Sequence, residues 1–481
     1  MNHSNLSAHK FKKGKFVTPW NEIMDSLSRE ESWFHGRLPE YIWLGLIINE
    51  YGREDGFKKC HDILNKLHNL LPTQYVPRFS SVLNMEEQKQ KEFYLYIMEI
   101  IPATVISPLT TIFTFSQFPY FSTTFALGRQ SISERHNKIS LVLDKASDHQ
   151  THFSTDIRFL VLYFQLLSGR LHMPKEILEL ILEYPHLSHE DKKMQMVRPT
   201  VRSMEMSHNM IEPPDANYID MFWEAVSRMS DCKIIKLDYE LEKSDTNLYI
   251  DKVEAILRYY SELLKSSSPL DNKMLVLFGI TTFSYKRLVE VVKHNLYNAI
   301  AARSVVRVLV EDYIMIKYLL KEETTHTDIW TEYQYYGIGQ YKLVVERILE
   351  YGKDDGDSHV NVKYLDALVN EYRDKEFIDM DTSYFDKKNV REKAIYVGEK
   401  DLFGHYYDYD SAFEHGLWGA IRESSLLKCM SPAHQYHCVP DYEGTQNMKS
   451  VWHDCVQVMN KTLSVLENTY GLPSYLKIED Q

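Results

Sequence analysis

The stretch that decides the fold class is AIAARSVVRVLVEDYIMIKYLL, residues 299–320. Its apolar side chains recur at steps of three and four residues, which places them on one side of an α-helix. These side chains are Ala299, Ala302, Val306, Leu309, Tyr313, Ile316 and Leu320. We predict a helix here, within a long helical region that runs from Phe283 to Lys321, and we expect its apolar side to be buried.

The composition of the whole chain favours the same class of structure. The chain has 481 residues, which suits two or three domains rather than one core. It contains only 18 Gly and 16 Pro, although strand-and-turn architectures need these residues at their many chain reversals. We therefore predict an all-α fold made of helical modules.

A short polar run at 242–247 is the predicted boundary between two helical modules. We assign residues 1–241 to an N-terminal module, in which the segment 41–48 is apolar nearly all round and should be a buried helix. We assign residues 248–475 to a C-terminal module. Its further predicted helices are 249–265, 332–351, 362–373, 412–430 and 451–470.

Charge and cysteine content narrow the class of protein. The net charge is −13, whereas a protein held on nucleic acid mainly by phosphate contacts usually carries the opposite sign. The one compact basic stretch, 9–15, reads as a solvated tail. Five scattered cysteines give no disulfide framework, and we see neither a signal peptide nor a membrane span. We expect a cytoplasmic protein that needs no cofactor, since nucleotide-binding and hydrolase motifs are missing.

Three charged residues recur every four positions beside the apolar stripe, namely Arg303, Arg307 and Glu311. They stack along one edge of the predicted helix. One interpretation is a ladder of ion pairs within the helix, each worth about 0.3–0.5 kcal/mol. The other is a pocket wall that presents guanidinium groups to an anionic ligand. The sequence leaves both open.

The predicted helix 412–430 gives a second polar face. Ser411, His415, Trp418 and Arg422 share it. A histidine beside a tryptophan is typical of a packed core histidine, and a catalytic histidine is the alternative. Gly416 and Gly419 each cost about 1 kcal/mol relative to Ala inside a helix. We predict that this face packs closely against another helix, of this chain or of a second copy.

Cysteines and histidines gather near the C-terminus, which raises the question of a zinc site. The residues are Cys429, His434, His437, Cys438, His453 and Cys455. Their spacing lacks the paired C-x₂-C of a strong zinc signature. We interpret the cluster as coincidence and predict no metal site.

Two segments, AARSVVRVLVEDYIMIKYLL (301–320) and YDYDSAFEHG (407–416), carry a resemblance to a known family. Residues 301–320 and 407–416 resemble an uncharacterised bacterial family, catalogued as a domain of unknown function. That family is itself similar to the HEPN helical bundles (higher eukaryotes and prokaryotes nucleotide-binding). The resemblance runs from Asp245 to the C-terminus and implies a HEPN-like helical bundle.

What the resemblance implies for function depends on an arginine and a histidine. In HEPN ribonucleases, which use no metal, the histidine moves the proton of the attacking 2′-hydroxyl and the arginine stabilises charge on the phosphate. Here Ser411 and His415 match the family pattern, but Asp408 stands where the arginine is expected. Arg287 and His294, seven residues apart on one predicted helix face, are a substitute pair.

Three classes of function therefore stay open. The first is an interaction or regulatory component of a bacterial stress or phage-defence system, acting as a homodimer or with a partner protein. The second is a metal-independent ribonuclease acting on RNA, with His415 or His294 as the base. Its phosphate clamp would be Arg287, Arg303 or Arg422. The third is a sensor that binds an anionic small ligand along the Arg303 edge.

Overall fold

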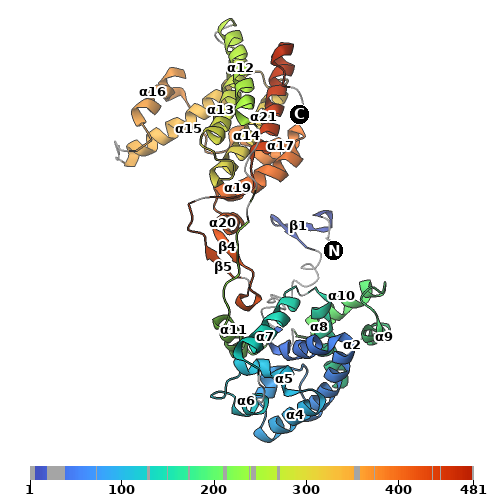
Figure 1. The fold of residues 1–481 in the computed structure, drawn as a ribbon. Helices are drawn as coiled ribbons and strands as arrows, with labels where there is room; N and C mark the ends of the chain where they lie inside the picture. Colours follow the sequence, from blue (N-terminus) through green and yellow to red (C-terminus); the bar gives the residue numbers. More distant parts are fainter. Residues whose placement is uncertain are drawn as a thin grey trace. The chain divides into compact units, whose positions relative to one another are not determined.

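The computed structural model is mostly helical, which confirms the predicted fold class (Figure 1). It describes residues 6–18, 38–71, 73–126, 130–148, 150–171, 174–209, 214–237, 239, 245–267, 271–351, 358–372, 374–435, 437–444 and 446–478. The predicted boundary run 242–247 lies partly outside these residues. The chain forms two compact units. Unit 1 comprises Met1–Ile235 with Lys428–Val439, and unit 2 comprises Lys236–Leu427 with Pro440–Gln481.

The first elements of unit 1 run from the N-terminus to the middle of its helical body. They are η1 (Leu6–Ala8), β1 (Lys10–Lys12), β2 (Lys15–Val17), α2 (Leu38–Leu70), α3 (Phe79–Leu83), α4 (Glu87–Ile100), α5 (Ala103–Ile106), η3 (Ser107–Thr111) and α6 (Pro119–Phe125). The remaining elements follow in order. They are α7 (Ile132–Ala146), α8 (His152–Leu167), α9 (Lys175–Glu183), η4 (Tyr184–His186), α10 (Met194–Asn209), α11 (Ala216–Arg228) and β3 (Ile234–Ile235).

The core of unit 1 forms around α2, which packs against α4, α7 and α8. Residues 38–48 of α2 are buried on all sides, as the apolar sequence predicted. The helix kinks at Gly52, whose φ of 74° suits a residue without a side chain. In the described part of the chain, no single helix is both long and apolar enough to cross a bilayer. Glu87–Ile100 and Ala103–Thr111 reach that length only together, across a bend of 110°.

The basic stretch near the N-terminus is a hairpin rather than the predicted tail. Strands β1 and β2 pair antiparallel, with Lys10 opposite Val17 and Lys12 opposite Lys15. Lys13 and Gly14 form the turn with positive φ angles of 49° and 77°. The strands are mostly exposed, so this hairpin adds little to either core.

The helices of unit 2 begin with four long ones. They are α12 (Thr246–Lys265), α13 (Asn272–Lys293), α14 (Ile300–Glu322) and α15 (Ile329–Tyr351). Shorter elements come next. They are α16 (Val362–Tyr372), η5 (Lys375–Phe377), η6 (Phe385–Lys387), α17 (Val390–Val397), α18 (Lys400–Leu402), the π-helical turn η7 (Phe403–Tyr407), α19 (Asp408–Glu414) and α20 (Trp418–Ser424). The chain then forms β4 (Leu426–Cys429), η8 (Pro432–His434) and β5 (Cys438–Pro440), in which residues 428–439 belong to unit 1. Unit 2 ends with α21 (Trp452–Tyr470) and η9 (Ser474–Leu476).

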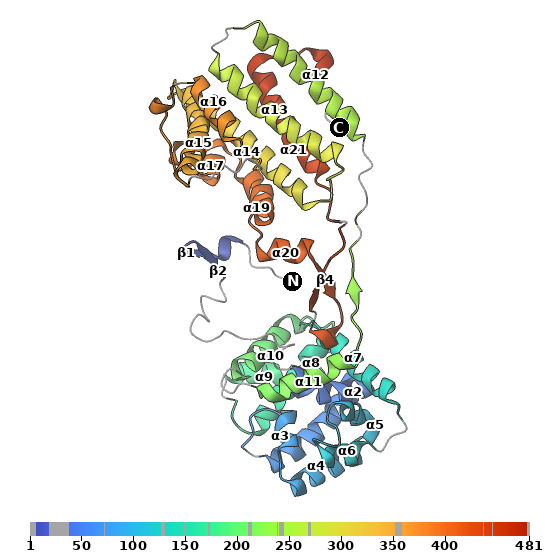
Figure 2. The same cartoon turned by 90° about the vertical axis from the view of Figure 1, so that its left-hand side faces the viewer.

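Helix α14 lies at the centre of unit 2 and contains most of the apolar stretch 299–320. It packs against α13, α17, α19 and α21, and Figure 2 shows α12, α13 and α21 lying alongside one another. Its predicted apolar stripe is buried from Ala302 to Ile316, whereas Ala299 and Leu320 at its ends are partly exposed. The predicted continuous region 283–321 is wrong in one respect. It is two helices, because the chain turns at Asn295 with a φ of 52°.

A small sheet involves segments far apart in the sequence, in the strand order β3-β4-β5. Strands β3 and β4 are antiparallel, with Ile234 opposite Cys429. Residues 428–439, which the sequence analysis placed in the C-terminal module, thus belong to unit 1. Ala433 of this segment is buried in the core of that unit.

Candidate functional site

The two segments that carry the family resemblance meet in unit 2, where α19 packs against α14. Arg307 on α14 donates from Nε to Ser411 Oγ at 3.1 Å and from Nη2 to the Tyr407 hydroxyl at 2.6 Å. Its guanidinium group also lies 4.6 Å from the centre of the Tyr407 ring. Arg307 on the charged edge of α14 is therefore hydrogen-bonded directly to Ser411 on α19.

Glu311 on α14 pairs with the Arg307 nitrogen, Nη1, that does not bond to Ser411 or Tyr407. Its carboxylate lies 3.4 Å from Arg307 Nη1, one helical turn back, and accepts a 2.6 Å hydrogen bond from the Tyr384 hydroxyl. Arg307 and Glu311 thus form the ion pair that the ladder interpretation expected. The pair is partly exposed, so its contribution to stability is modest.

Arg303 has a different environment from Arg307, although both lie on the same edge of α14. Its residue is only 3% exposed. Nη1 donates to the backbone carbonyl groups of Tyr297 and Ala299, and Nη2 donates to that of Lys449. Burial lowers the pKa of the guanidinium group. Arg303 therefore ties the start of α14 to the segment before α21 and does not face solvent.

Asp410 on α19, which was not predicted as a site residue, is a buried acid near Arg303. It is 3% exposed, and burial raises the pKa of its carboxyl group to about 7 despite the nearby positive charge of Arg303. Asp454 and Glu423 add to the rise. The sequence signal was its helical register, since Asp410 lies three residues before the buried Phe413.

We expect Asp410→Asn to change how the stability of the protein depends on pH. The folded pKa is raised, so the wild type loses stability as pH rises from about 4, the unfolded value, to about 7. The variant lacks this loss, and its stability relative to wild type should increase by roughly 2–4 kcal/mol over that window. Urea unfolding at a series of pH values measures the difference.

The comparison of wild type with Asp410→Asn also cancels the contribution of a second buried acid. Asp312 on α14 also has a pKa raised to about 7 by burial, and it is present in both proteins. The difference between them therefore isolates Asp410. A wild-type-to-variant difference that stays flat from pH 4 to 8 contradicts the raised pKa.

His415 lies just past the end of α19, as its C-terminal cap. The residue is exposed, and its ring makes no hydrogen bond to any residue that the structure describes. Its backbone N–H bonds to the Ser411 carbonyl group, which places the two residues one helical turn apart. His415 is therefore near the Arg307–Ser411 contact in the chain but does not take part in it.

The predicted helix 412–430 is wrong. The chain closes α19 with a Schellman motif, in which Leu417 N–H bonds to the Ala412 carbonyl and Gly416 N–H to that of Phe413. Gly416 has the left-handed φ of 55° that this motif needs. Arg422 consequently lies on α20, where it donates to the Leu426 carbonyl group, and does not share a helix face with His415.

The predicted close packing at Gly416 and Gly419 is also wrong within this chain. Both residues are exposed, and a Cβ atom built on either would meet nothing within 4 Å. The role of Gly416 is conformational rather than steric, since it ends α19 with a positive φ. Trp418 beside the two glycines is 70% exposed, so it does not pack around His415 as a core residue.

The substitute pair is not brought together as a catalytic unit. Arg287 on α13 pairs with Glu290 at 2.6 Å. His294 caps the C-terminus of α13 through its backbone N–H, which bonds to the Glu290 carbonyl group, and its exposed ring forms no hydrogen bond with the described residues. In the described part of unit 2, no three His, Cys, Asp or Glu side chains converge closely enough to hold a metal ion.

The fold and these contacts define unit 2 as an all-α domain in which a polar contact joins two helices. Residues 274–430 match the model of a family of unknown function, DUF5677. This match contains every predicted site residue, from Arg287 to Arg422. No curated protein and no solved structure matched the chain. The resemblance to an uncharacterised family is thereby confirmed in part, and the likeness to HEPN bundles stays a prediction.

Proposed function

We propose that unit 2 is an interaction module that pairs with a second copy of this chain through the exposed face of α13. This makes it a component of the interaction or regulatory kind, in the stress or phage-defence setting that the resemblance implied. The observation that carries the proposal is an exposed apolar stripe along α13, with a groove on each side.

The stripe consists of Leu275, Gly279 and Phe283, one helical turn apart. Leu275 is 45% exposed and Phe283 is 52% exposed, although both lie on a helix whose other sides are buried. A Cβ atom built on Gly279 would meet nothing within 4 Å. A glycine between two large apolar residues lets another helix approach closely at that point, with the large side chains on either side of the crossing.

The grooves follow the stripe on both sides. The one between α13 and α15 has a volume of about 590 Å³, and Leu275, Gly279 and Tyr341 line it. The one between α12 and α13 has about 360 Å³, and its lining includes Gly279, Phe283 and Leu264. A ridge with a groove on each flank fits a second ridge of the same kind, as ridges-into-grooves packing requires.

The patch suits a second copy of this chain as the partner, because a two-fold axis would place the patch against itself. If α13 crosses its mate antiparallel at Gly279, the two-fold axis runs across both helices, so the α12 sides of the two copies face each other and the α15 sides do the same. Tyr341, which is 45% exposed, then faces the larger groove of the mate, between its α13 and α15. The same patch is thus self-complementary, as an isologous interface must be.

Charges at the ends of the stripe support this antiparallel register. Lys286 follows Gly279 by seven residues and Asp271 precedes it by eight. At a shallow crossing angle of about 20°, each Lys286 lies beside Asp271 of the second copy. Lys286 is exposed and forms no ion pair with a residue that the structure describes. The pairing therefore gives this lysine a partner in the dimer, twice by symmetry.

Size-exclusion chromatography with light scattering tests the proposal on the full chain. A dimer has twice the chain mass of 56.8 kDa, and its fraction should rise with concentration. A mass that stays at the monomer value at the highest soluble concentration rules the proposal out.

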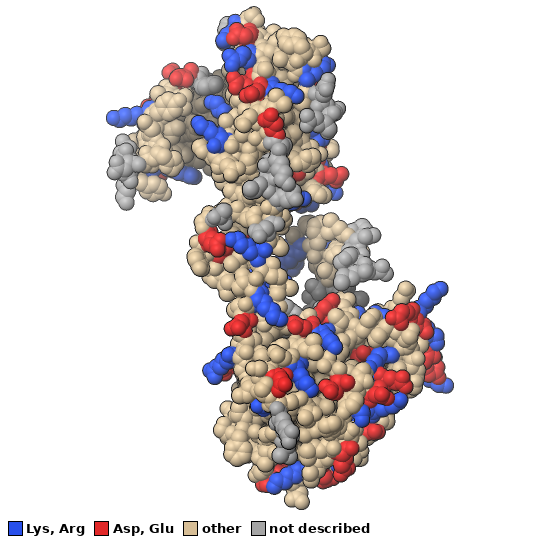
Figure 3. All heavy atoms as spheres, viewed as in Figure 1, with Lys and Arg blue, Asp and Glu red and all other residues tan. Residues whose placement is uncertain are grey.

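The second candidate is a metal-independent ribonuclease, and one contact favours it. Arg307 from α14 reaches Ser411, one turn before His415, so a neighbouring helix supplies an arginine where the chain itself has Asp408. The surface charge speaks against a ribonuclease, because Lys and Arg lie interspersed with Asp and Glu on the face in Figure 3, where the described residues form no basic surface for RNA.

Incubation of wild type, His415→Ala and His294→Ala with total RNA tests the ribonuclease hypothesis. Cleavage lost only in His415→Ala supports this site, and the absence of cleavage by wild type excludes it.

The third class of function, a sensor of an anionic ligand, gains no support from the contacts. Arg303 is bonded to backbone carbonyl groups, and Arg307 is bonded to Ser411, Tyr407 and Glu311. An anion would have to displace these partners. The sensor stays a prediction of the sequence alone.

A further inference from the structure

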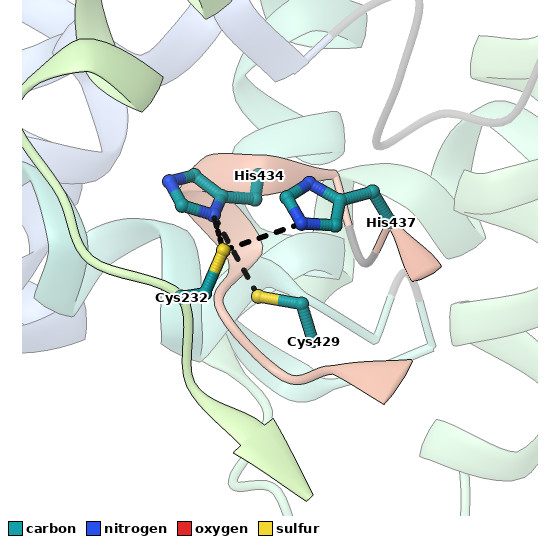
Figure 4. A group of neighbouring side chains, drawn as sticks. All are labelled: Cys232, Cys429, His434 and His437. Carbon is teal, nitrogen blue, oxygen red and sulfur yellow. Dashed lines mark hydrogen bonds between the residues drawn. The ribbon is translucent and has the colours of Figure 1, made fainter. Parts of the chain in front are cut away.

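We propose a structural zinc site in unit 1, formed by Cys232, Cys429, His434 and His437 (Figure 4). The four ligand atoms lie within 4.8 Å of one another. The site is independent of the pairing proposed for unit 2.

The distances suit a tetrahedral ion. Cys232 Sγ lies 3.3 Å from His434 Nδ1 and 3.3 Å from His437 Nε2, and Cys429 Sγ lies 3.6 Å from His434 Nδ1. A zinc ion bound at about 2.3 Å to sulfur and about 2.0 Å to nitrogen requires sulfur-to-nitrogen separations of about 3.5 Å. The four side chains are therefore spaced as ligands around one centre, where Figure 4 shows them pointing.

The surroundings orient the ligands for a metal. His434 Nε2 lies 2.9 Å from the Ser230 carbonyl oxygen and 3.2 Å from that of Ser227, so this nitrogen carries the proton. Nδ1 is then left unprotonated, with its lone pair toward both cysteines, as in a metal-bound histidine held by a carbonyl group. The backbone N–H of Ser431 donates to Cys429 Sγ, which stabilises a thiolate.

The local chain is shaped to present these groups. Cys429 ends β4, and its N–H bonds to the His437 carbonyl group across the turn. Gln435, between the two histidines, adopts a left-handed φ of 53°. Cys232 comes from the loop after α11 and lies beside β4 through the pairing of Ile234 with Cys429. The site thus joins two segments of unit 1 that are about 200 residues apart in the chain.

The ligand set indicates zinc and a structural role. Two thiolates with two imidazoles are the ligands of closed, four-coordinate zinc sites, and four protein ligands leave no open position for a substrate. The prediction of no metal site rested on residues 429–455, whose spacing alone lacks a strong zinc signature. Three residues of that cluster are not ligands. Cys438 lies in β5, and His453 and Cys455 belong to α21 of unit 2.

Metal content of the full chain, purified after expression with added zinc, tests the site. We expect elemental mass spectrometry to find one zinc ion per chain. Cys232→Ser and His437→Ala should lose it, whereas the matched controls Cys438→Ser and His453→Ala should keep it. Zinc that persists in Cys232→Ser, or a wild type without zinc, overturns the proposal.

Two measurements on the wild type test the site without any substitution, so they do not depend on whether a variant folds. Replacement of zinc by Co²⁺ should give thiolate-to-cobalt charge-transfer bands and the strong visible bands of a tetrahedral ion. Removal of the metal by a chelator should lower the melting temperature, and added Zn²⁺ should restore it. A Co²⁺ spectrum without thiolate bands, or a Cys232–Cys429 disulfide in freshly purified protein, contradicts the assignment.

Discussion

Arg303→Ala should lower the free energy of unfolding of unit 2 by about 3–5 kcal/mol, the largest stability loss that we expect from any residue of the candidate site. The substitution leaves the carbonyl groups of Tyr297, Ala299 and Lys449 without this donor. It also opens a cavity where a side chain with 3% exposure was packed. Chemical unfolding followed by circular dichroism measures the loss.

Arg307→Ala is the matched control on the same edge of α14. Its side chain is 22% exposed and its partners are side chains that can turn to water, so the expected loss is only about 1 kcal/mol. Equal losses for the two variants contradict the distinct roles that we assign. If Arg303→Ala is as stable as wild type, Arg303 does not tie α14 to the segment before α21.

Phe283→Asp should weaken the association of two copies by about 100-fold or more, which corresponds to about 2.8 kcal/mol. Each dimer would contain the substitution twice, and each carboxylate would be buried against the apolar face of the mate. The monomer should fold normally, because Phe283 is 52% exposed in the single chain. Sedimentation equilibrium gives the dissociation constant.

Leu349→Asp serves as the control for that experiment. Leu349 is an apolar residue of α15 that is 60% exposed and lies outside both grooves beside α13. We expect it to leave the dissociation constant unchanged. Equal weakening by both substitutions would mean that added charge, rather than the stripe on α13, controls association.

The central helix could be predicted from the sequence because its apolar residues repeat at helical spacing and become buried. The break between α13 and α14 could not, since neither Gly nor Pro marks it. Asn295 adopts the left-handed conformation instead, which asparagine tolerates better than most residues. Gly416 did mark the end of α19, and its meaning as a helix terminator was available from the sequence.

The candidate sites were less predictable than the helices. The contact of Arg307 with Ser411 joins residues 104 positions apart. Both residues could be singled out from the sequence, but their mutual distance could not, because periodicity shows which face of a helix a residue occupies and not what covers that face. The cysteine–histidine group was missed for the same reason. Its first ligand, Cys232, lies outside any spacing motif, and only the pairing of β3 with β4 brings it to the others.

Cross-linking of Gly279→Cys tests most directly whether two copies meet at α13. Antiparallel helices that cross at residue 279 bring the two cysteines within the Cα separation of about 4.4–6.8 Å that a disulfide needs. Under mild oxidation we expect a disulfide-linked dimer from Gly279→Cys but not from Leu349→Cys or wild type. If Gly279→Cys stays uncrosslinked at concentrations where the wild type is dimeric, the copies meet elsewhere and the proposed interface is wrong.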